Sequence, residues 1–195
     1  SGHVRIYRWA DGSWNQLGTD IDGEATDDRS GYSVSLSADA STVAIGAVHN
    51  NENGHHSGHV RIYRWLDGNW NQLGSDIDGE AAGDYTGDSV SLSADGSVLA
   101  IGAPRNHNDV NGEFTGHVRI YRWADGSWNQ LGTDIDGEAA GDYSGYVSLS
   151  ADGSTVAIGA HRNDGNGDNS GHVRIYRWAD DNWNQLGTDI DGEAA

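Results

Sequence analysis

The chain has 195 residues, of which 35% are hydrophobic and 29 are glycine, so each segment has little apolar material for a core. Thirty acidic and 11 basic residues give a formal net charge of −19, which repels nucleic-acid phosphates and anionic membrane surfaces and excludes nucleic acid as a partner. The sequence has no cysteine for disulfides or thiolate metal sites, and no segment approaches the roughly 20 apolar residues that membrane insertion requires.

A phrase of eight residues, Gly-His-Val-Arg-Ile-Tyr-Arg-Trp, occurs four times. Its copies start at Gly2, Gly58, Gly116 and Gly171, with spacings of 56, 58 and 55 residues. Repeats of this length indicate a solenoid, a propeller or a linear array. Because the chain opens inside a repeat, we expect it to be an excerpt of a longer protein.

Each repeat begins with a predicted hairpin. Residues 3–9 alternate Val4 and Ile6 with larger polar and aromatic side chains, a pattern typical of a strand. Residues 10–13 contain Asp-Gly and predict a turn, after which residues 14–17 return as the partner strand. We refer to this pair as the outer hairpin.

A second predicted hairpin follows an acidic segment. Residues 32–37 alternate bulky residues with serine, and residues 42–47 read Thr-Val-Ala-Ile-Gly-Ala. Serine, alanine and glycine share one face, as expected where neighbouring sheets come close together. The two hairpins form a four-stranded antiparallel unit with apolar groups on both faces, which needs a similar sheet on each side. Radial stacking of such units gives an all-β propeller, and a linear stack satisfies the same need.

The second hairpin, which we call the inner hairpin, resembles a known repeat. Residues 30–39 read Ser-Gly-Tyr-Ser-Val-Ser-Leu-Ser-Ala-Asp, and residues 100–104 read Ala-Ile-Gly-Ala-Pro. These segments resemble the FG-GAP repeat of integrin alpha-subunit propellers, and the whole period is similar to a subgroup frequent in secreted or surface-anchored proteins of bacteria and algae. The resemblance covers essentially all 195 residues. It implies a β-propeller of four-stranded blades.

The family resemblance also implies a Ca²⁺ loop within the first hairpin of each blade. The corresponding turns, at residues 38–40, 94–96 and 151–153, have one carboxylate each. Ca²⁺ takes about six to eight oxygen ligands. We therefore do not expect integrin-type calcium sites at these turns.

The resemblance gives a single repeat domain, residues 1–195. Its blades are residues 31–83, 87–141 and 145–195, with residues 1–28 as the outer half of a preceding blade. This amounts to about three and a half blades, whereas closure of a ring takes at least about four. The ring is therefore incomplete without further blades or other copies of the chain. Joining identical chains leaves one of the four outer hairpins unpaired, which favours a longer protein.

The acidic segment between the hairpins supplies the first candidate metal ligands. Asp20, Asp22, Glu24 and Asp28 are spaced so that their oxygens are able to surround a hard cation such as Ca²⁺. The structural alternative is that arginines at two fixed strand positions, Arg5 and Arg8 and their copies, pair with these carboxylates across blade boundaries.

The loops between the two hairpins supply further candidates. Oxygen ligands for Ca²⁺ occur at alternate positions in one loop and more loosely in another: Asp164, Asn166 and Asp168, and Asp109, Asn111 and Glu113. The alternative is an ordinary turn rich in Gly, Asn and Asp. Among the histidines, the set that begins each repeat is interpreted as structural. His55 and His56, with His59 nearby, are either transition-metal ligands or part of a solvated loop.

Two tryptophans flank each outer turn. They are candidates for stacking on sugar rings or anchoring a partner, with packing between blades as the alternative. The eight positions are Trp9, Trp14, Trp65, Trp70, Trp123, Trp128, Trp178 and Trp183. No catalytic arrangement is recognisable: the sequence has no nucleophile elbow, no cysteine and no lysine for a phosphate-binding loop.

The sequence favours a non-enzymatic scaffold for adhesion or for binding a glycan or protein ligand. Its near-identical strands carry loops that differ at residues 48–57, 104–115 and 161–170, which is where specificity would reside. The acidic, lysine-free composition favours an extracellular or cell-surface location. The alternative is a self-assembling repeat that forms rings, fibres or surface layers from copies of itself. A glycoside-active enzyme is a third hypothesis.

Overall fold

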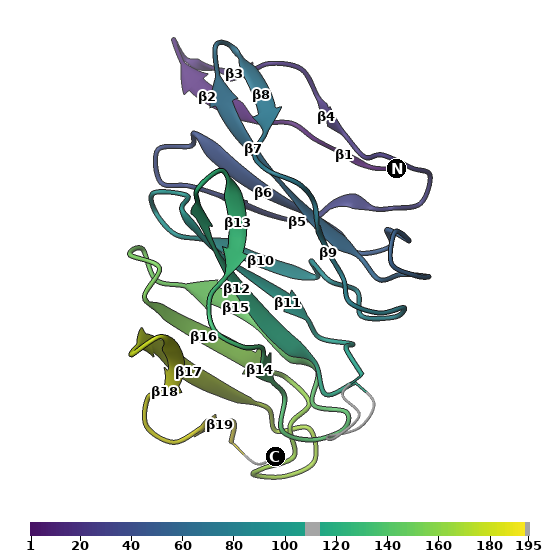
Figure 1. Ribbon diagram of the computed structural model, residues 1–195, viewed down its shortest axis with the longest axis vertical. Coiled ribbons are helices and arrows are strands. Elements are labelled where there is room, and N and C mark those ends of the chain that lie inside the picture. The colour runs from purple at the N-terminus through teal and green to yellow at the C-terminus, as the bar shows by residue number, and fades with distance from the viewer. Residues whose placement is uncertain (108–113, 194–195) are drawn as a thin grey trace.

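The computed structural model describes residues 1–107 and 114–193, and every regular element in them is a β-strand. Three antiparallel sheets of five strands follow one another along the chain, and we call each sheet a blade (Figure 1). No helix long and apolar enough to cross a membrane is present in this part of the chain.

The strands of the first blade are β5 (Ser30–Leu36), β6 (Thr42–Ala47), β7 (His59–Leu66), β8 (Asn69–Gln72) and β9 (Ile77–Asp78). Those of the second are β10 (Ser89–Leu92), β11 (Val98–Ala103), β12 (His117–Ala124), β13 (Ser127–Gln130) and β14 (Ile135–Asp136). Those of the third are β15 (Ser144–Leu149), β16 (Thr155–Ala160), β17 (His172–Ala179), β18 (Asn182–Gln185) and β19 (Ile190–Asp191).

An outer half-blade precedes them. It contains β1 (His3–Val4), β2 (Tyr7–Ala10), β3 (Ser13–Gln16) and β4 (Ile21–Asp22), with β1 paired to β4 and β2 paired to β3. The described residues therefore form three complete blades and one outer half-blade, as the hairpin pattern predicts.

The acidic segment was expected to be only a connection between the two hairpins, but it contains a strand. Its Ile-Asp pair forms a short fifth strand in each blade, and in the first blade β9 pairs with the start of β7, with Ile77 opposite Val60. The strand forms because Ile77 is buried there, at 7% exposure. The outer strand of each blade is thus made of two pieces, β8 and β9 in the first.

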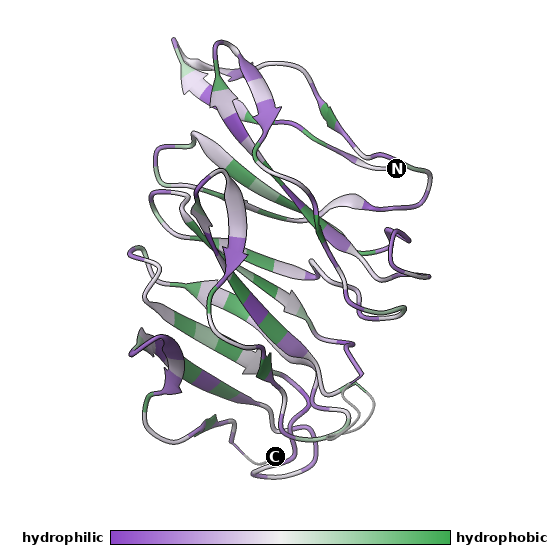
Figure 2. Ribbon diagram, in the orientation of Figure 1, coloured by the Kyte–Doolittle hydropathy of each residue, from purple (hydrophilic) through white to green (hydrophobic). Residues whose placement is uncertain are grey.

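The hydrophobic core lies between the blades rather than within one of them. One buried cluster combines Val60 and Ile62 of the first blade with Leu99 and Ile101 of the second. Similar clusters fill the junctions on either side. Figure 2 shows the hydrophobic residues concentrated in the central strands and the hydrophilic ones in the loops and outer hairpins. Each sheet is therefore stabilised by its neighbours, as its two apolar faces predict.

The inner strands of neighbouring blades approach closely because their facing side chains are small. The Cα of Gly46 packs directly on the backbone carbonyl of Gly87 in the next blade. The Ser33 hydroxyl donates a hydrogen bond to that carbonyl at 2.6 Å, and the Leu92 N–H donates to the Ser35 hydroxyl at 3.0 Å. The alternating serines therefore connect one inner strand to the next.

The third blade lacks one residue at the start of its inner strand, and a bulge absorbs the difference. In β5 the pairing is interrupted between Ser30 and Ser33, and in β15 it is interrupted between Ser144 and Tyr146. The bulge of β15 is therefore one residue shorter. Beyond it, Val147 pairs with the isoleucine of β16, as its counterpart does in the first blade. The register is preserved, so no side chain changes face.

Candidate functional site

A cluster of one glutamate, one histidine and one aspartate recurs where each blade meets the preceding one. At the first junction, between the half-blade and the first blade, it consists of Glu24, His59 and Asp76, whose ligand atoms lie within 4.8 Å of one another. Glu24 follows β4, His59 begins β7, and Asp76 precedes β9. The other two copies are Glu80, His117 and Asp134, and Glu138, His172 and Asp189.

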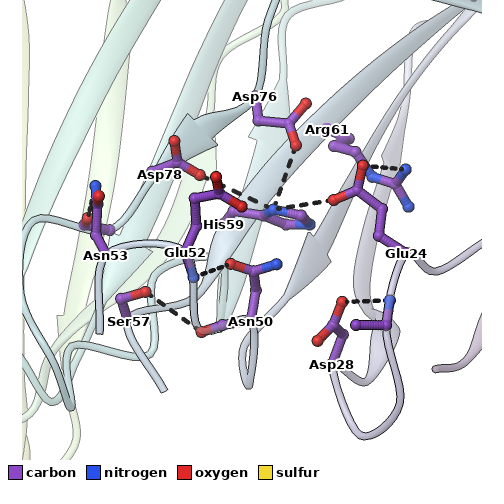
Figure 3. Close-up of polar contacts among 12 residues, drawn as sticks. Glu24, Asp28, Asn50, Glu52, Asn53, Ser57, His59, Arg61, Asp76 and Asp78 are labelled. Carbon is purple, nitrogen blue, oxygen red and sulfur yellow. Dashed lines mark hydrogen bonds and ion pairs between the residues drawn. The ribbon is translucent and has the colours of Figure 1, made fainter. Parts of the chain in front are cut away.

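The imidazole of the first junction is buried and faces several carboxylates (Figure 3). His59 Nδ1 lies 3.5 Å from Asp76 Oδ2, 3.9 Å from Glu24 Oε2 and 4.0 Å from Asp78 Oδ1. The His59 side chain is 2% exposed, and its Nδ1 has no hydrogen-bond partner within the described chain. Burial lowers the pKa of His59, which favours the neutral imidazole, and raises the pKa values of Glu24 and Asp78.

An arginine of the following blade contacts the acidic segment at each junction. The Arg61 guanidinium donates a hydrogen bond to the backbone carbonyl of Asp22 at 2.8 Å and lies 3.5 Å from Glu24 Oε1. Arg119 and Arg174 make the same contacts at the next two junctions. Contacts between arginine and the acidic segment across blade boundaries, the structural alternative of the sequence analysis, are therefore present.

The four acidic residues proposed first as a group have separate environments. Asp20 accepts hydrogen bonds from Arg5 at 2.9 Å and Gln16 at 2.8 Å, and Asp28 is buried and accepts one from the Ala25 N–H at 3.0 Å. Glu24 instead joins residues of the next blade. The sequence analysis grouped the acids of one repeat, whereas the cluster combines acids of two. Cation binding by Asp20, Asp22, Glu24 and Asp28 stays a prediction.

The loop that follows β16 uses its candidate ligands in hydrogen bonds that close the loop. Asp164 Oδ1 accepts the Asn169 N–H at 2.7 Å, Asn166 Nδ2 donates to the Gly192 carbonyl at 2.8 Å, and Asp168 Oδ1 accepts Asn169 Nδ2 at 3.0 Å. Calcium binding at this loop stays a prediction. The looser copy, Asp109, Asn111 and Glu113, lies outside the described residues.

The inner-hairpin turns, where the integrin resemblance places calcium, do not present a ligand set. Asp39 Oδ1 accepts hydrogen bonds from the Ser37 hydroxyl at 2.7 Å and the Ser41 N–H at 2.9 Å. These hydrogen bonds lower the pKa of Asp39 to about 2. Asp95 and Asp152 have the same role in the other blades. The single carboxylate of each turn caps the turn instead.

The tryptophans of the three complete blades pack against the preceding outer hairpin. Trp70 Nε1 donates a hydrogen bond to the Leu17 carbonyl at 3.0 Å, and Gly18 lies against the Trp65 and Trp70 indoles. Trp128 and Trp183 make the equivalent bonds. Trp9 and Trp14 of the half-blade are 57% and 66% exposed. Packing between blades is therefore present, and ligand binding by the tryptophans stays a prediction.

A pocket of about 260 Å³ lies between the first and second blades, at residues where the repeat departs from its own pattern. Its lining includes Arg29, His49, Tyr85, Asp88 and Arg105. The loops joining β6 to β7 and preceding β10 meet on one side of the stack, on the right in Figure 1, which we call the loop face. Arg29 stands where the next two repeats have tyrosine, and His49 stands where they have arginine.

The pocket is formed by stacked rings and cations. The Arg105 guanidinium lies over the Tyr85 ring at 4.2 Å from its centroid, and the His49 and His56 rings stack at 4.0 Å. The Tyr85 hydroxyl lies 3.0 Å from His56 Nδ1. Burial raises the pKa of Asp88, which also lines the pocket. Tyr85 has a left-handed backbone, with φ of 57°, as do Arg29 and Tyr143 at the same repeat position, so this conformation belongs to the repeat.

Two features were missed by the sequence analysis. The histidine that begins each repeat was interpreted as structural, and His59 was considered for a metal only beside His55 and His56. In every repeat, however, this histidine precedes the aspartate of the acidic segment by 17 residues, as His59 precedes Asp76. That fixed spacing is the signal in the sequence that the histidine and the aspartate belong together. The pocket had a weaker signal, the departure of Arg29 and His49 from the repeat.

Comparison with known proteins identifies the repeat. A family model described as FG-GAP repeat matches residues 19–63, from the acidic segment through most of β7. The chain carries an FG-GAP repeat. A comparison with curated proteins found no match to the sequence.

Solved structures resemble this FG-GAP chain in fold. A putative 6-phosphogluconolactonase from Bacteroides uniformis matches 98% of the chain with a TM-score of 0.63 and 12% identity, over 49% of its own length. A protein from Lactobacillus plantarum matches 99% of the chain with a TM-score of 0.59 and 16% identity, over 50% of its length. At these identities the similarity concerns the fold alone, which is that of β-propeller blades. The FG-GAP chain spans about half the length of these structures.

Proposed function

We propose that the FG-GAP chain is a non-enzymatic, extracellular or cell-surface scaffold that binds a glycan or protein ligand through its loop face. Its blades are a repeated frame, and the side chains that differ between repeats gather around the pocket between the first and second blades. Residues repeated in every blade serve the repeat, whereas a binding site requires groups that break the symmetry. The asymmetry of this pocket is the observation that carries the proposal.

The chemistry of the pocket suits a polar ligand with a flat or ring-shaped part. Tyr85 and the stacked histidines offer aromatic faces, and Arg29 and Arg105 offer hydrogen-bond donors. Asp88 adds a hydrogen-bond acceptor to the lining. Such a combination of aromatic surface and charged donors is common in sites for glycans and for protein side chains.

The test is a screen of the purified chain against arrays of glycans and extracellular protein fragments, followed by affinity measurements. Arg29→Ala removes a pocket cation that stands where the next two repeats have tyrosine, and we expect affinity for the ligand to fall at least about tenfold, as for a central contact residue. Arg8→Ala is the matched control, because it removes the same charge from the exposed β2 strand. Absence of any ligand, or equal affinity of the two variants, would contradict the proposal.

Self-assembly is the second candidate function, and the exposed ends of the stack support it. Val173 and Ile190 of the third blade are 36% and 57% exposed, whereas their counterparts in the first blade, Val60 and Ile77, are 0% and 7% exposed under the neighbouring blade. They line a groove of about 400 Å³. A further blade, from this polypeptide or another copy, would cover the same surface.

We expect light scattering to show a mass that rises with concentration if copies associate through this groove. Val173→Glu places a charge in the groove and is expected to hold the chain at its monomer mass. Ser127→Glu adds the same charge to an exposed outer turn and is expected to leave assembly unchanged. A monomer mass at every concentration of the unmodified chain would remove this candidate.

A further inference from the structure

The first junction contains two buried polar atoms that face each other without hydrogen-bond partners in the described chain. They are His59 Nδ1 and Asp78 Oδ1, which lie 4.0 Å apart. Buried polar atoms are nearly always satisfied, so each such exception calls for an explanation. A bound ion explains both atoms at once, because each would become a ligand.

The separations at this junction are too long for hydrogen bonds and slightly longer than those between ligands around an ion. His59 Nδ1 lies 3.5–4.0 Å from the oxygens of Asp76, Glu24 and Asp78, whereas an N–H···O hydrogen bond spans about 2.7–3.2 Å. Around an ion with bonds of about 2.0–2.2 Å, ligand atoms lie roughly 3.0–3.5 Å apart. A small inward movement of the exposed Glu24 side chain and the half-buried Asp78 side chain would complete such a shell.

The charge at the junction favours a cation. Glu24, Asp76, Asp78 and Glu52 line a common cavity of about 450 Å³, and Glu52 extends towards His59 from the loop after β6 (Figure 3). Arg61 is the cation that pairs with this group, through Glu24. The carboxylates repel one another, and a divalent cation would offset that repulsion. The cavity also gives an ion access from solvent.

The structure assigns a binding site for a divalent first-row transition ion, such as Zn²⁺ or Mn²⁺, to Glu24, His59, Asp76 and Asp78. An imidazole nitrogen combined with carboxylates suits these ions, whereas Ca²⁺ takes oxygen ligands. Because Glu24 belongs to the half-blade and the other three to the first blade, the ion would link two blades.

The test counts metal ions bound to the purified chain by equilibrium dialysis against Zn²⁺ and, separately, Mn²⁺. We expect His59→Asn to bind one equivalent fewer than the unmodified chain, whatever the other two junctions bind. His3→Asn is the matched control, because His3 has the same repeat position in the half-blade but is exposed. It is expected to leave the number of bound ions unchanged.

Since His59 is buried, its variant risks a folding defect, so Asp78→Asn and Glu24→Gln provide a second measurement on more exposed ligands. Each is expected to weaken binding at the first junction roughly tenfold or more. The ion should also raise the unfolding midpoint of the unmodified chain more than that of Asp78→Asn, because it binds only the folded junction. The assignment would be overturned if His59→Asn and His3→Asn bound the same number of ions. It would also be overturned if His59→Asn lost one equivalent of Ca²⁺ but no Zn²⁺ or Mn²⁺.

Discussion

Replacing Gly102 with alanine is expected to destabilise the fold by about 3 kcal/mol or more. Gly102 lies in β11, and its Cα packs on the backbone carbonyl of Gly145 in the next blade. A Cβ at this position would overlap that carbonyl. Because the carbonyl belongs to the backbone, it cannot move away by a change of side-chain rotamer. Overpacking typically costs about 1–3 kcal/mol, and a clash between two main chains belongs at the upper end or beyond. Urea unfolding followed by tryptophan fluorescence would measure the loss.

The third blade offers a matched control at the same repeat position. Gly159 is the counterpart of Gly102, but no blade among the described residues covers it, and a Cβ there would lie 3.6 Å from the Cβ of Tyr146, an ordinary contact. Neither glycine has the left-handed backbone that disfavours side chains. Gly159→Ala is therefore expected to change stability by less than about 1 kcal/mol. Equal losses in the two variants would show that the blades do not approach as described.

These two glycines illustrate how much of the fold is predictable from the sequence. The period-2 alternation of residues 32–37 and the Thr-Val-Ala-Ile-Gly-Ala segment predict both the inner hairpin and its small-residue face, because burial and close approach restrict side-chain size locally. The serine hydrogen bonds were not predicted. They depend on the exact offset between two inner strands, as in the Ser33 contact with Gly87, which no single repeat specifies.

The candidate sites were harder to predict, for a related reason. Glu24 and His59 are 35 residues apart in the sequence and meet because consecutive blades stack. Analysis of one repeat at a time grouped Glu24 with Asp20 and Asp28, whose hydrogen bonds lie elsewhere. Pockets and ligand clusters in a repeat protein form between units, so they depend on how the units pack.

The two sites also imply different uses of symmetry. The Glu-His-Asp cluster is present at all three junctions, as expected for an element that holds blades together, and Glu52 adds a carboxylate at the first junction. The pocket around Tyr85 exists because Arg29 and His49 depart from the repeat. Metal binding at the first junction and ligand binding on the loop face are therefore separable, and variants at Asp78 and Arg29 should affect one each.

Trp183→Ala is expected to destabilise the chain by about 3–5 kcal/mol, the usual cost of removing a buried large aromatic side chain. Trp183 is 7% exposed, belongs to the core between the second and third blades, and donates a hydrogen bond from Nε1 to the Leu131 carbonyl at 3.0 Å. The substitution would leave both a cavity and an unpaired carbonyl at the blade boundary. The free energy of unfolding in urea measures the effect.

Trp14→Ala separates the two roles considered for the tryptophans. Trp14 has the same repeat position but is 66% exposed, and its ring lies 5.4 Å from that of Trp9, as the ring of Trp183 does from that of Trp178. The indole pair is therefore common to both variants, and the difference between them isolates packing between blades. We expect Trp14→Ala to cost less than about 1 kcal/mol. If the tryptophans instead serve ligand binding, Trp14→Ala would abolish glycan binding. Trp183→Ala would then leave the free energy of unfolding unchanged.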